Sequence, residues 1–198
     1  MNDAKSIGQR ELRRWVVPIS IGIAVLWLVP VSLVAVVASH EKHTWLGATW
    51  SYSWLILYAL SLLAWRLPSG WFRPREWEVR GRIYEALGVR WYKQFMLGGD
   101  RHNRRVRRRL ENYRIFADSR TTRRLANETR VSERVHIIML LFATWPALFG
   151  ALTGWWKYAA FVTAGNVLVN VYPIVLQRYT RSRIMRIERR RVASQGAA

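Results

Sequence analysis

Two uncharged stretches near the C-terminus carry most of the information on the fold. Residues 137–156 read IIMLLFATWPALFGALTGWW, and after Lys157 residues 158–176 read YAAFVTAGNVLVNVYPIVL. A helix of about 20 residues spans roughly 30 Å, the thickness of the hydrocarbon core of a bilayer. A helix also satisfies its own backbone polar groups in lipid. The two stretches therefore predict two membrane-spanning helices.

Two further uncharged stretches lie in the N-terminal third, at residues 16–38 and 45–65. They are long enough to span as well, and the first is too long for the core of a signal peptide, so we expect a retained anchor rather than a cleaved leader. The predicted fold class is an all-α integral membrane protein with four transmembrane helices. A basic amphipathic segment joins the second helix to the third.

The basic residues predict the orientation of these helices. The chain has 32 Lys and Arg against 12 Asp and Glu, and 30 of the 32 fall in residues 1–15, 66–136 and 177–198. Short basic segments stay on the cytoplasmic side of a membrane. We therefore expect a cytoplasmic N-terminus, a transmembrane pair (16–65), a cytoplasmic membrane-surface segment, a second transmembrane pair (137–176) and a cytoplasmic tail.

The central basic segment alternates aromatic and aliphatic residues with arginines, a pattern typical of short amphipathic helices on a membrane surface. A basic helix is expected at 103–116, and another from about Thr121 that continues into the third span. Juxtamembrane arginines commonly bind lipid headgroups or other phosphates. We expect that role here rather than nucleic-acid binding, because no nucleic-acid-binding fold is recognisable. The densest cluster is Arg104, Arg105, Arg107, Arg108 and Arg109.

Two amides lie inside the fourth predicted span, one helical turn apart. Asn166 and Asn170 share a helix face, and continuing the helix places Gln177 and Arg181 within about 60° of it. Amides in hydrocarbon need polar partners, so they either bond across helices or line a site. The two interpretations are a binding stripe for a ligand with a polar head and plain helix–helix adhesion.

A histidine and a glutamate stand three residues apart where the third span begins. Glu133 can orient the His136 imidazole, and an oriented imidazole is the usual general base for a hydroxyl. The alternative is that Glu128 and Glu133 form surface salt bridges with nearby arginines. A metal site is not expected, because a single Glu-x-x-His element supplies too few ligands. The chain has no cysteine, which excludes thiolate sites and a cysteine-linked acyl intermediate.

Several motifs resemble one family in their order and spacing. They are Arg82–Lys93 (RIYEALGVRWYK), Gly98-Gly99-Asp100, Glu128-Thr129-Arg130 with Glu133 and His136, and Asn170 with Gln177-Arg178-Tyr179-Thr180-Arg181. This set is similar to the glycosyl-4,4′-diaponeurosporenoate acyltransferases, small bacterial membrane enzymes of staphyloxanthin-type carotenoid synthesis. The chain departs from the family in having Met96-Leu97 before the Gly-Gly turn and Ser132 before Glu133.

The resemblance implies transfer of a fatty acyl group to a hydroxyl of a membrane-embedded glycolipid in a bacterial plasma membrane. The donor would be acyl-CoA or an acyl-carrier-protein thioester, with no bound cofactor. His136 and Glu133 would be catalytic, and Arg82, Lys93 and the arginines of 104–109 would bind donor phosphates. The residues expected to bind the acceptor are Glu128, Arg130, Asn166, Asn170, Gln177, Arg178 and Arg181.

A non-catalytic function is the rival hypothesis. Four spans and a basic cytoplasmic side also suit a small membrane subunit or scaffold that binds anionic phospholipids and a membrane protein partner. The two hypotheses differ in one structural requirement, because only an enzyme needs the polar groups around His136 to be brought together.

Overall fold

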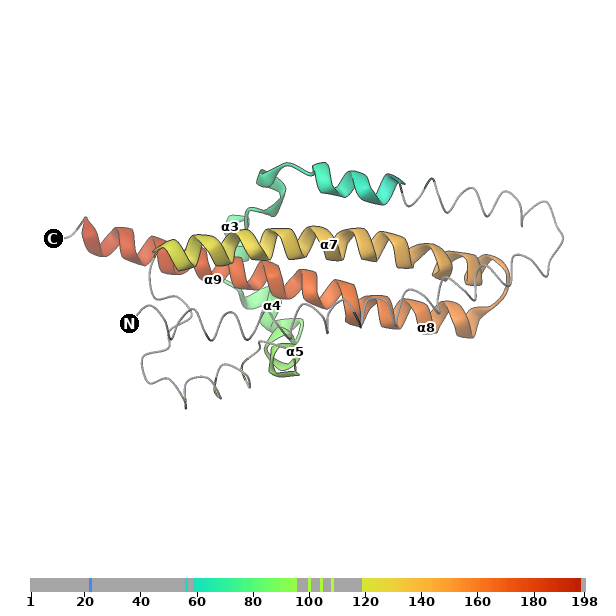
Figure 1. Cartoon of the computed structure of the whole chain (residues 1–198). Coiled ribbons are helices and arrows are strands. Elements are labelled where there is room, and N and C mark those ends of the chain that lie inside the picture. The colour runs from blue at the N-terminus through green and yellow to red at the C-terminus, as the bar shows by residue number, and fades with distance from the viewer. Residues whose placement is uncertain are drawn as a thin grey trace. The chain divides into compact units, whose positions relative to one another are not determined.

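The computed structural model describes residues 59–95 and 119–196, with residues 22, 56, 100, 104 and 108. In this part of the chain every regular element is helical and no strand occurs (Figure 1). Two of its helices, Arg120–Leu152 and Trp156–Gln195, are long and apolar enough to cross a membrane. The first covers the third predicted span up to Leu152, and the second contains the whole fourth predicted span. The first predicted span and most of the second lie outside the described residues, so the four-span arrangement stays a prediction.

Both long helices extend well beyond the apolar stretches that predict them. Helix α7 runs without interruption over Ser119–Leu152, which confirms that a helix beginning near Thr121 continues into the third span. The second long helix comprises α8 (Trp156–Asn166), the π-helical segment η3 (Val167–Val171) and α9 (Tyr172–Gln195).

The chain divides into two compact units. The first unit contains Phe72–Val131 and Val175–Ala198, and the second contains Ser132–Ile174 with the described residues before Phe72. The long helices thus contribute residues to both units.

In the second unit, α7 and α8 lie side by side (Figure 1). Gly150 of α7 allows this close approach, since a Cβ atom there would stand 2.7 Å from a ring carbon of Tyr158 and 3.3 Å from the Ala159 nitrogen. At the turn between the helices, the Trp155 ring makes edge-to-face contacts with Phe149 and Tyr158. A small residue at a helix crossing is typical of packing in membranes, where backbones must approach closely.

In the first unit, three short helices follow one another: α3 (Glu76–Val79), α4 (Arg82–Ala86) and α5 (Val89–Phe95). The helices are short because Gly81 and Gly88 have φ angles of 76° and 73°, which end one helix before the next begins. Tyr84 and Val89 pack with Tyr179 of α9 as a buried cluster, against which Val175 and Leu176 also pack. The expected short helices of this segment are therefore present.

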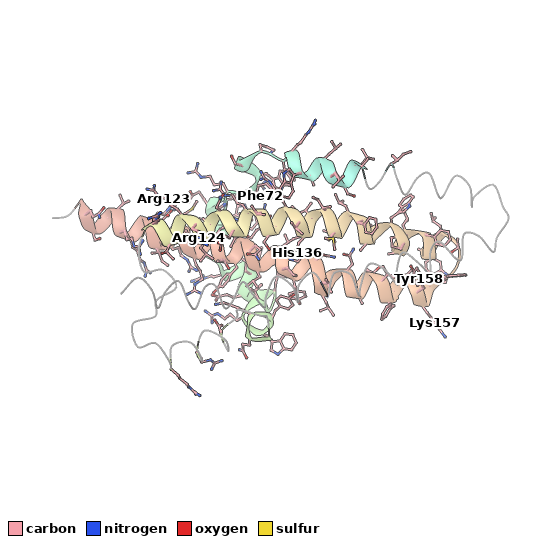
Figure 2. All side chains as sticks on the ribbon, in the orientation of Figure 1. Phe72, Arg123, Arg124, His136, Lys157 and Tyr158 are labelled. Atoms are coloured by element: carbon pink, nitrogen blue, oxygen red, sulfur yellow. The ribbon has the colours of Figure 1, made fainter. Side chains whose placement is uncertain are left out.

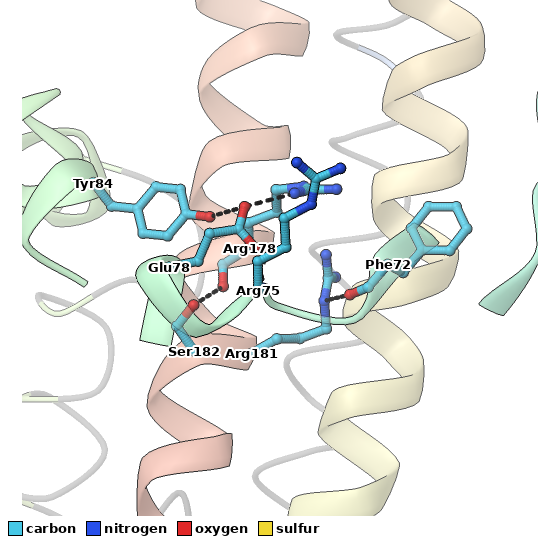
Figure 3. Close-up of polar contacts among 7 residues, drawn as sticks. All are labelled: Phe72, Arg75, Glu78, Tyr84, Arg178, Arg181 and Ser182. Carbon is cyan, nitrogen blue, oxygen red and sulfur yellow. Dashed lines mark hydrogen bonds and ion pairs between the residues drawn. The ribbon is translucent and has the colours of Figure 1, made fainter. Parts of the chain in front are cut away.

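A buried carboxylate ties α3 to α9. Glu78 is 2% exposed and accepts three hydrogen bonds, from the Arg75 backbone N–H (2.6 Å), the Tyr84 hydroxyl (2.8 Å) and the Arg178 guanidinium (2.7 Å) (Figure 3). Burial alone raises the pKa of Glu78, but these three donors together hold it below its ordinary value of 4.5. Burial and the adjacent carboxylate raise the pKa of Tyr84. Glu78 is therefore ionised and fully partnered at neutral pH.

Other arginines of α9 hold the backbone of the same segment. The Arg181 side chain is buried, and its Nε donates to the Phe72 carbonyl over 2.9 Å (Figure 3). Arg186 donates to the Arg80 carbonyl over 3.3 Å. On the surface, Arg189 makes two hydrogen bonds to Glu76, of 2.6 and 3.0 Å. The arginines along α9 thus hold the 72–86 segment in place.

The pairing of Glu78 with Arg178 predicts a large stability effect. Replacing Glu78 by Gln removes a buried charge and leaves the partly buried Arg178 guanidinium without its counter-charge, so we expect the apparent free energy of unfolding to fall by about 3 kcal/mol. Glu76→Gln is the matched control, because its partner Arg189 is exposed and such pairs contribute below about 1 kcal/mol. Denaturant titration in mixed micelles measures both variants.

The pH dependence follows from the lowered pKa of Glu78. A carboxyl whose folded pKa is depressed stabilises the fold above its unfolded value, and that contribution is lost as the pH falls through the folded value. The deficit of the Glu78→Gln protein should therefore be full at pH 7 and shrink below about pH 4.5. Equal deficits for Glu76→Gln and Glu78→Gln at neutral pH would contradict the assignment.

Candidate functional site

His136 stands at one end of a chain of polar groups in the second unit. Its Nδ1 lies 3.3 Å from Asn170 Oδ1, and Asn170 Nδ2 donates to Asn166 Oδ1 over 2.8 Å. Asn166 Nδ2 in turn reaches two acceptors on α7, the Leu140 carbonyl (3.1 Å) and the Thr144 hydroxyl (3.3 Å). Figure 2 marks His136 on α7. The chain joins the two long helices and returns to α7 one turn beyond its starting point.

The Leu140 carbonyl sets the direction of every bond in this chain. A carbonyl can only accept, so the Asn166 amide nitrogen must face it and the Asn166 oxygen must face Asn170. By the same argument the Asn170 nitrogen faces Asn166 and its oxygen faces His136. An oxygen can only accept from the imidazole, so Nδ1 carries a hydrogen. In the neutral ring Nε2 then holds the free lone pair.

The helix geometry around Asn170 is unusual. Residues Val167–Val171 are π-helical, and the Tyr172 N–H donates to the Val167 carbonyl five residues back. Pro173 follows directly and has no N–H to offer the helix, so the ordinary bonding pattern is interrupted here in any case. Single π-turns within α-helices are frequent at functional sites. Asn170, which is 1% exposed, lies within this turn.

The two acidic residues near His136 have different surroundings. Glu128 is exposed and pairs with Arg124 over 3.1 Å, which is the surface salt bridge that the alternative interpretation expected. Glu133 is 1% exposed, so a surface salt bridge does not describe it. The hydrogen-bond partner described for His136 is Asn170, across the helices. A role for Glu133 in orienting the imidazole stays a prediction.

Three arginines and one glutamine that were predicted to bind the acceptor belong to the first unit. Arg178 is bound to Glu78, Arg181 is bound to the Phe72 carbonyl, and Gln177 and Arg130 are half-buried. Two of the four thus hold the fold together, whatever else they do. Since the asparagines with His136 lie in the second unit, the continuous polar stripe from Asn166 to Arg181 stays a prediction.

The residues predicted to bind donor phosphates lie on or near the surface where they are described. Arg82, Arg104 and Arg108 are exposed. Lys93 makes a salt bridge of 2.7 Å with Asp100, whose backbone carbonyl also accepts from Arg104 Nε over 3.4 Å. Arg105, Arg107 and Arg109 lie outside the described residues, as does most of the helix expected at 103–116.

A shallow hollow lies beside the Asn166 end of the polar chain. It has a volume of about 670 Å³, and Thr144, which accepts a hydrogen bond from Asn166, forms part of its lining. The remaining lining is almost entirely apolar and includes Ala147, Ala151, Ala159, Ala160 and Ala164. Such a surface suits a hydrocarbon chain better than a polar ligand. No group of three or more His, Asp or Glu side chains suited to a metal occurs in the described part of the chain.

Three important groups did not emerge from the sequence. Glu78 was visible as an acidic residue in a strongly basic segment, but its partner Arg178 is 100 residues away. The Leu140 carbonyl and the Thr144 hydroxyl complete the His136 chain, and no sequence pattern points to a particular backbone carbonyl. The nearest usable signal is the pair of asparagines, whose amides need polar partners either on a neighbouring helix or in a bound ligand.

Comparison with known proteins agrees with the motifs. No curated protein and no solved structure matched the chain. A family model described as glycosyl-4,4′-diaponeurosporenoate acyltransferase matches residues 68–190, which include α3, α4, α5, α7, α8 and all but the last turn or so of α9. This match covers more than half of the sequence and confirms the resemblance. The chain belongs to the glycosyl-4,4′-diaponeurosporenoate acyltransferase family.

Proposed function

We propose that this protein transfers a fatty acyl group from a soluble thioester to a hydroxyl of a membrane-embedded glycolipid, with His136 as the general base. One observation carries the mechanism: two buried asparagines fix the His136 ring so that Nε2 holds a lone pair. A scaffold protein has no need of an imidazole prepared in this way. The family and the two long apolar helices support an acyltransferase that works at a membrane.

The reaction needs one proton acceptor that later becomes a donor. Nε2 of His136 removes the proton of the acceptor hydroxyl as its oxygen attacks the thioester carbonyl carbon. A tetrahedral intermediate forms, the carbon–sulfur bond breaks, and the leaving thiolate takes the proton back from the imidazolium. The products are an ester and a free thiol. Because the chain has no cysteine, the acyl group cannot be held on the enzyme as a thioester, which agrees with direct transfer.

The neutral partner of His136 suits this role. A carboxylate bonded to Nδ1 would stabilise the imidazolium, whereas the Asn170 amide orients the ring without adding charge. In apolar surroundings a neutral ring is also the less costly form. Asn166 and Asn170 are therefore assigned as positioning residues, and acceptor contact through their remaining donors and lone pairs is a secondary role. Glu133 remains a candidate second orienting group.

The substrates are assigned to surfaces by their chemistry. The alanine-lined hollow suits the hydrocarbon tail of a substrate. It lies in the same unit as His136 and adjoins Thr144, which accepts a hydrogen bond from Asn166. Exposed Arg104 and Arg108 are suited to the phosphates of coenzyme A or to an acidic acyl-carrier protein. The carotenoid glycoside named by the family is one acceptor of the proposed class, and other lipid-linked sugars share its chemistry.

The central test removes the proposed base. His136→Ala should lower the rate of acyl transfer about 10²- to 10⁴-fold while leaving thermal stability near that of the parent, because an imidazole acting as general base contributes on that scale. Val135→Ala, an exposed neighbour on the same helix, is the control and should retain activity. The assay follows a labelled acyl group in nanodiscs. Transfer by the His136→Ala protein at the parental rate would refute the mechanism.

A second test concerns the charge of the partner. Asn170→Asp keeps an acceptor for the Nδ1 hydrogen but adds a negative charge that favours the imidazolium. The base form then persists only at higher pH, so the acid limb of the pH–rate profile should move upward by about one unit or more.

Asn170→Ala separates orientation from charge. It should lower the rate at every pH without moving the acid limb upward, because the ring loses its fixed tautomer but gains no negative charge. An acid limb that stays in place in the Asn170→Asp protein would show that His136 is not the group being titrated.

A further inference from the structure

The segment that carries α3, α4 and α5 has one face fixed in the first unit. Val79, Tyr84, Val89 and Tyr92 are buried, and Tyr84 is held twice, by its hydrogen bond to Glu78 and by its edge-to-face contact with Tyr179. This anchoring prevents the segment from rolling. The side chains on its outer positions therefore have no route into the core.

Those outer positions hold large apolar side chains. Trp77 is 55% exposed, Ile83 46%, Leu87 51% and Trp91 64%. The last three follow one another at intervals of four residues, across the α4–α5 junction at Gly88. Single exposed apolar residues are ordinary, but four within fifteen residues of a well-anchored segment indicate a surface that something covers.

The polar residues among these side chains indicate which environment covers the surface. Arg80, Arg82 and Arg90 are exposed in the same segment, and Arg90 also pairs with Glu85 over 2.8 Å. Tryptophan and arginine side by side are typical of the zone between hydrocarbon and water, where the indole is half-immersed and guanidinium groups meet lipid phosphates. An acidic protein partner would match the exposed arginines but not the exposed Trp, Ile and Leu side chains between them.

We propose that the face formed by Trp77, Ile83, Leu87 and Trp91 is immersed in the headgroup region of an anionic bilayer, with Arg80 and Arg82 bound to lipid phosphates. The long apolar helices already bring the chain to a bilayer. This immersion goes beyond the proposed acyl transfer and does not depend on it, since the surface is defined by exposure and charge alone. It gives the membrane-surface segment predicted from the sequence a specific lipid-facing side.

The experiment uses the absence of cysteine, which allows a spin label at any single position. Ile83→Cys, Leu87→Cys and Trp91→Cys are prepared in the full chain, with Ser194→Cys on the exposed end of α9 as the control. In nanodiscs containing phosphatidylglycerol, labels at 83, 87 and 91 should collide more with oxygen than with a water-soluble nickel chelate. The label at 194 should show the reverse.

Two outcomes would overturn the proposal. Nickel access at 83, 87 and 91 equal to that at 194 would place the face in water. Immobile labels that neither reagent reaches would show a protein contact instead, with a second copy or another partner. Crosslinking of the unmodified chain with a diazirine phospholipid gives an independent measurement, with adducts expected on peptides of residues 77–91.

A charge arm tests the anionic lipid requirement. Arg80→Gln with Arg82→Gln should move the labels toward water in nanodiscs that contain phosphatidylglycerol. In phosphatidylcholine alone the same substitutions should have little effect, because juxtamembrane arginines gain their attraction from anionic headgroups. An equal effect in both lipids would exclude recognition of anionic headgroups.

Discussion

The hydrogen bond from the Asn166 amide to the Leu140 carbonyl determines how the other polar groups of the second unit are oriented. A buried amide in an apolar helix needs a partner inside the protein, and a neighbouring helix supplies it. Because the acceptor is a backbone carbonyl, neither amide can turn over without losing a bond. One interaction therefore fastens α8 to α7, orients Asn170 and determines which nitrogen of His136 carries hydrogen.

In the first unit the buried polar group that joins the helices is charged. Glu78 is buried, and its negative charge is matched by Arg178 and by donors from Tyr84 and the Arg75 backbone. The charged pair holds a segment of very short helices, which have little stability of their own because few residues share the cost of nucleation. The neutral amide chain orients His136, and the charged cluster around Glu78 holds the short helices α3 and α4. Arg178 and Arg181, which the sequence predicted to bind the acceptor, make structural contacts in this unit.

The sequence predicted the parts of the fold that depend on local composition. Charge-free stretches located the long helices, the run from Thr121 predicted the continuity of α7, and four-residue spacing placed Asn166 and Asn170 together. Other features depend on contacts that spacing along one helix cannot show. Glu133 stands three residues from His136, yet the described partner of His136 is Asn170, 34 residues away on the other long helix.

The same reasoning explains why the π-turn was missed. An extrapolation of 100° per residue assumes bonds to the fourth residue back, but at Tyr172 the bond goes to the fifth. Pro173 has no N–H, so it marks a break in the bonding pattern here but not the form that the break takes. Glu78 and Arg178 show the same limit, because many arginines were equally available to one carboxylate. The family was identifiable because its motifs keep their order, a property that does not require knowing where any side chain points.

The amide chain behind His136 has a further consequence for the movement of protons. An amide N–H does not exchange its hydrogen readily with a neighbouring carbonyl, so the Asn170–Asn166 chain orients the ring but does not act as a proton wire. A proton accepted at Nε2 is therefore not passed on through Nδ1 and the two amides. Under the proposed mechanism the proton leaves from the same nitrogen, Nε2, and passes to the leaving sulfur. Each turnover would then return its proton within the site, from the acceptor hydroxyl to the donor thiolate.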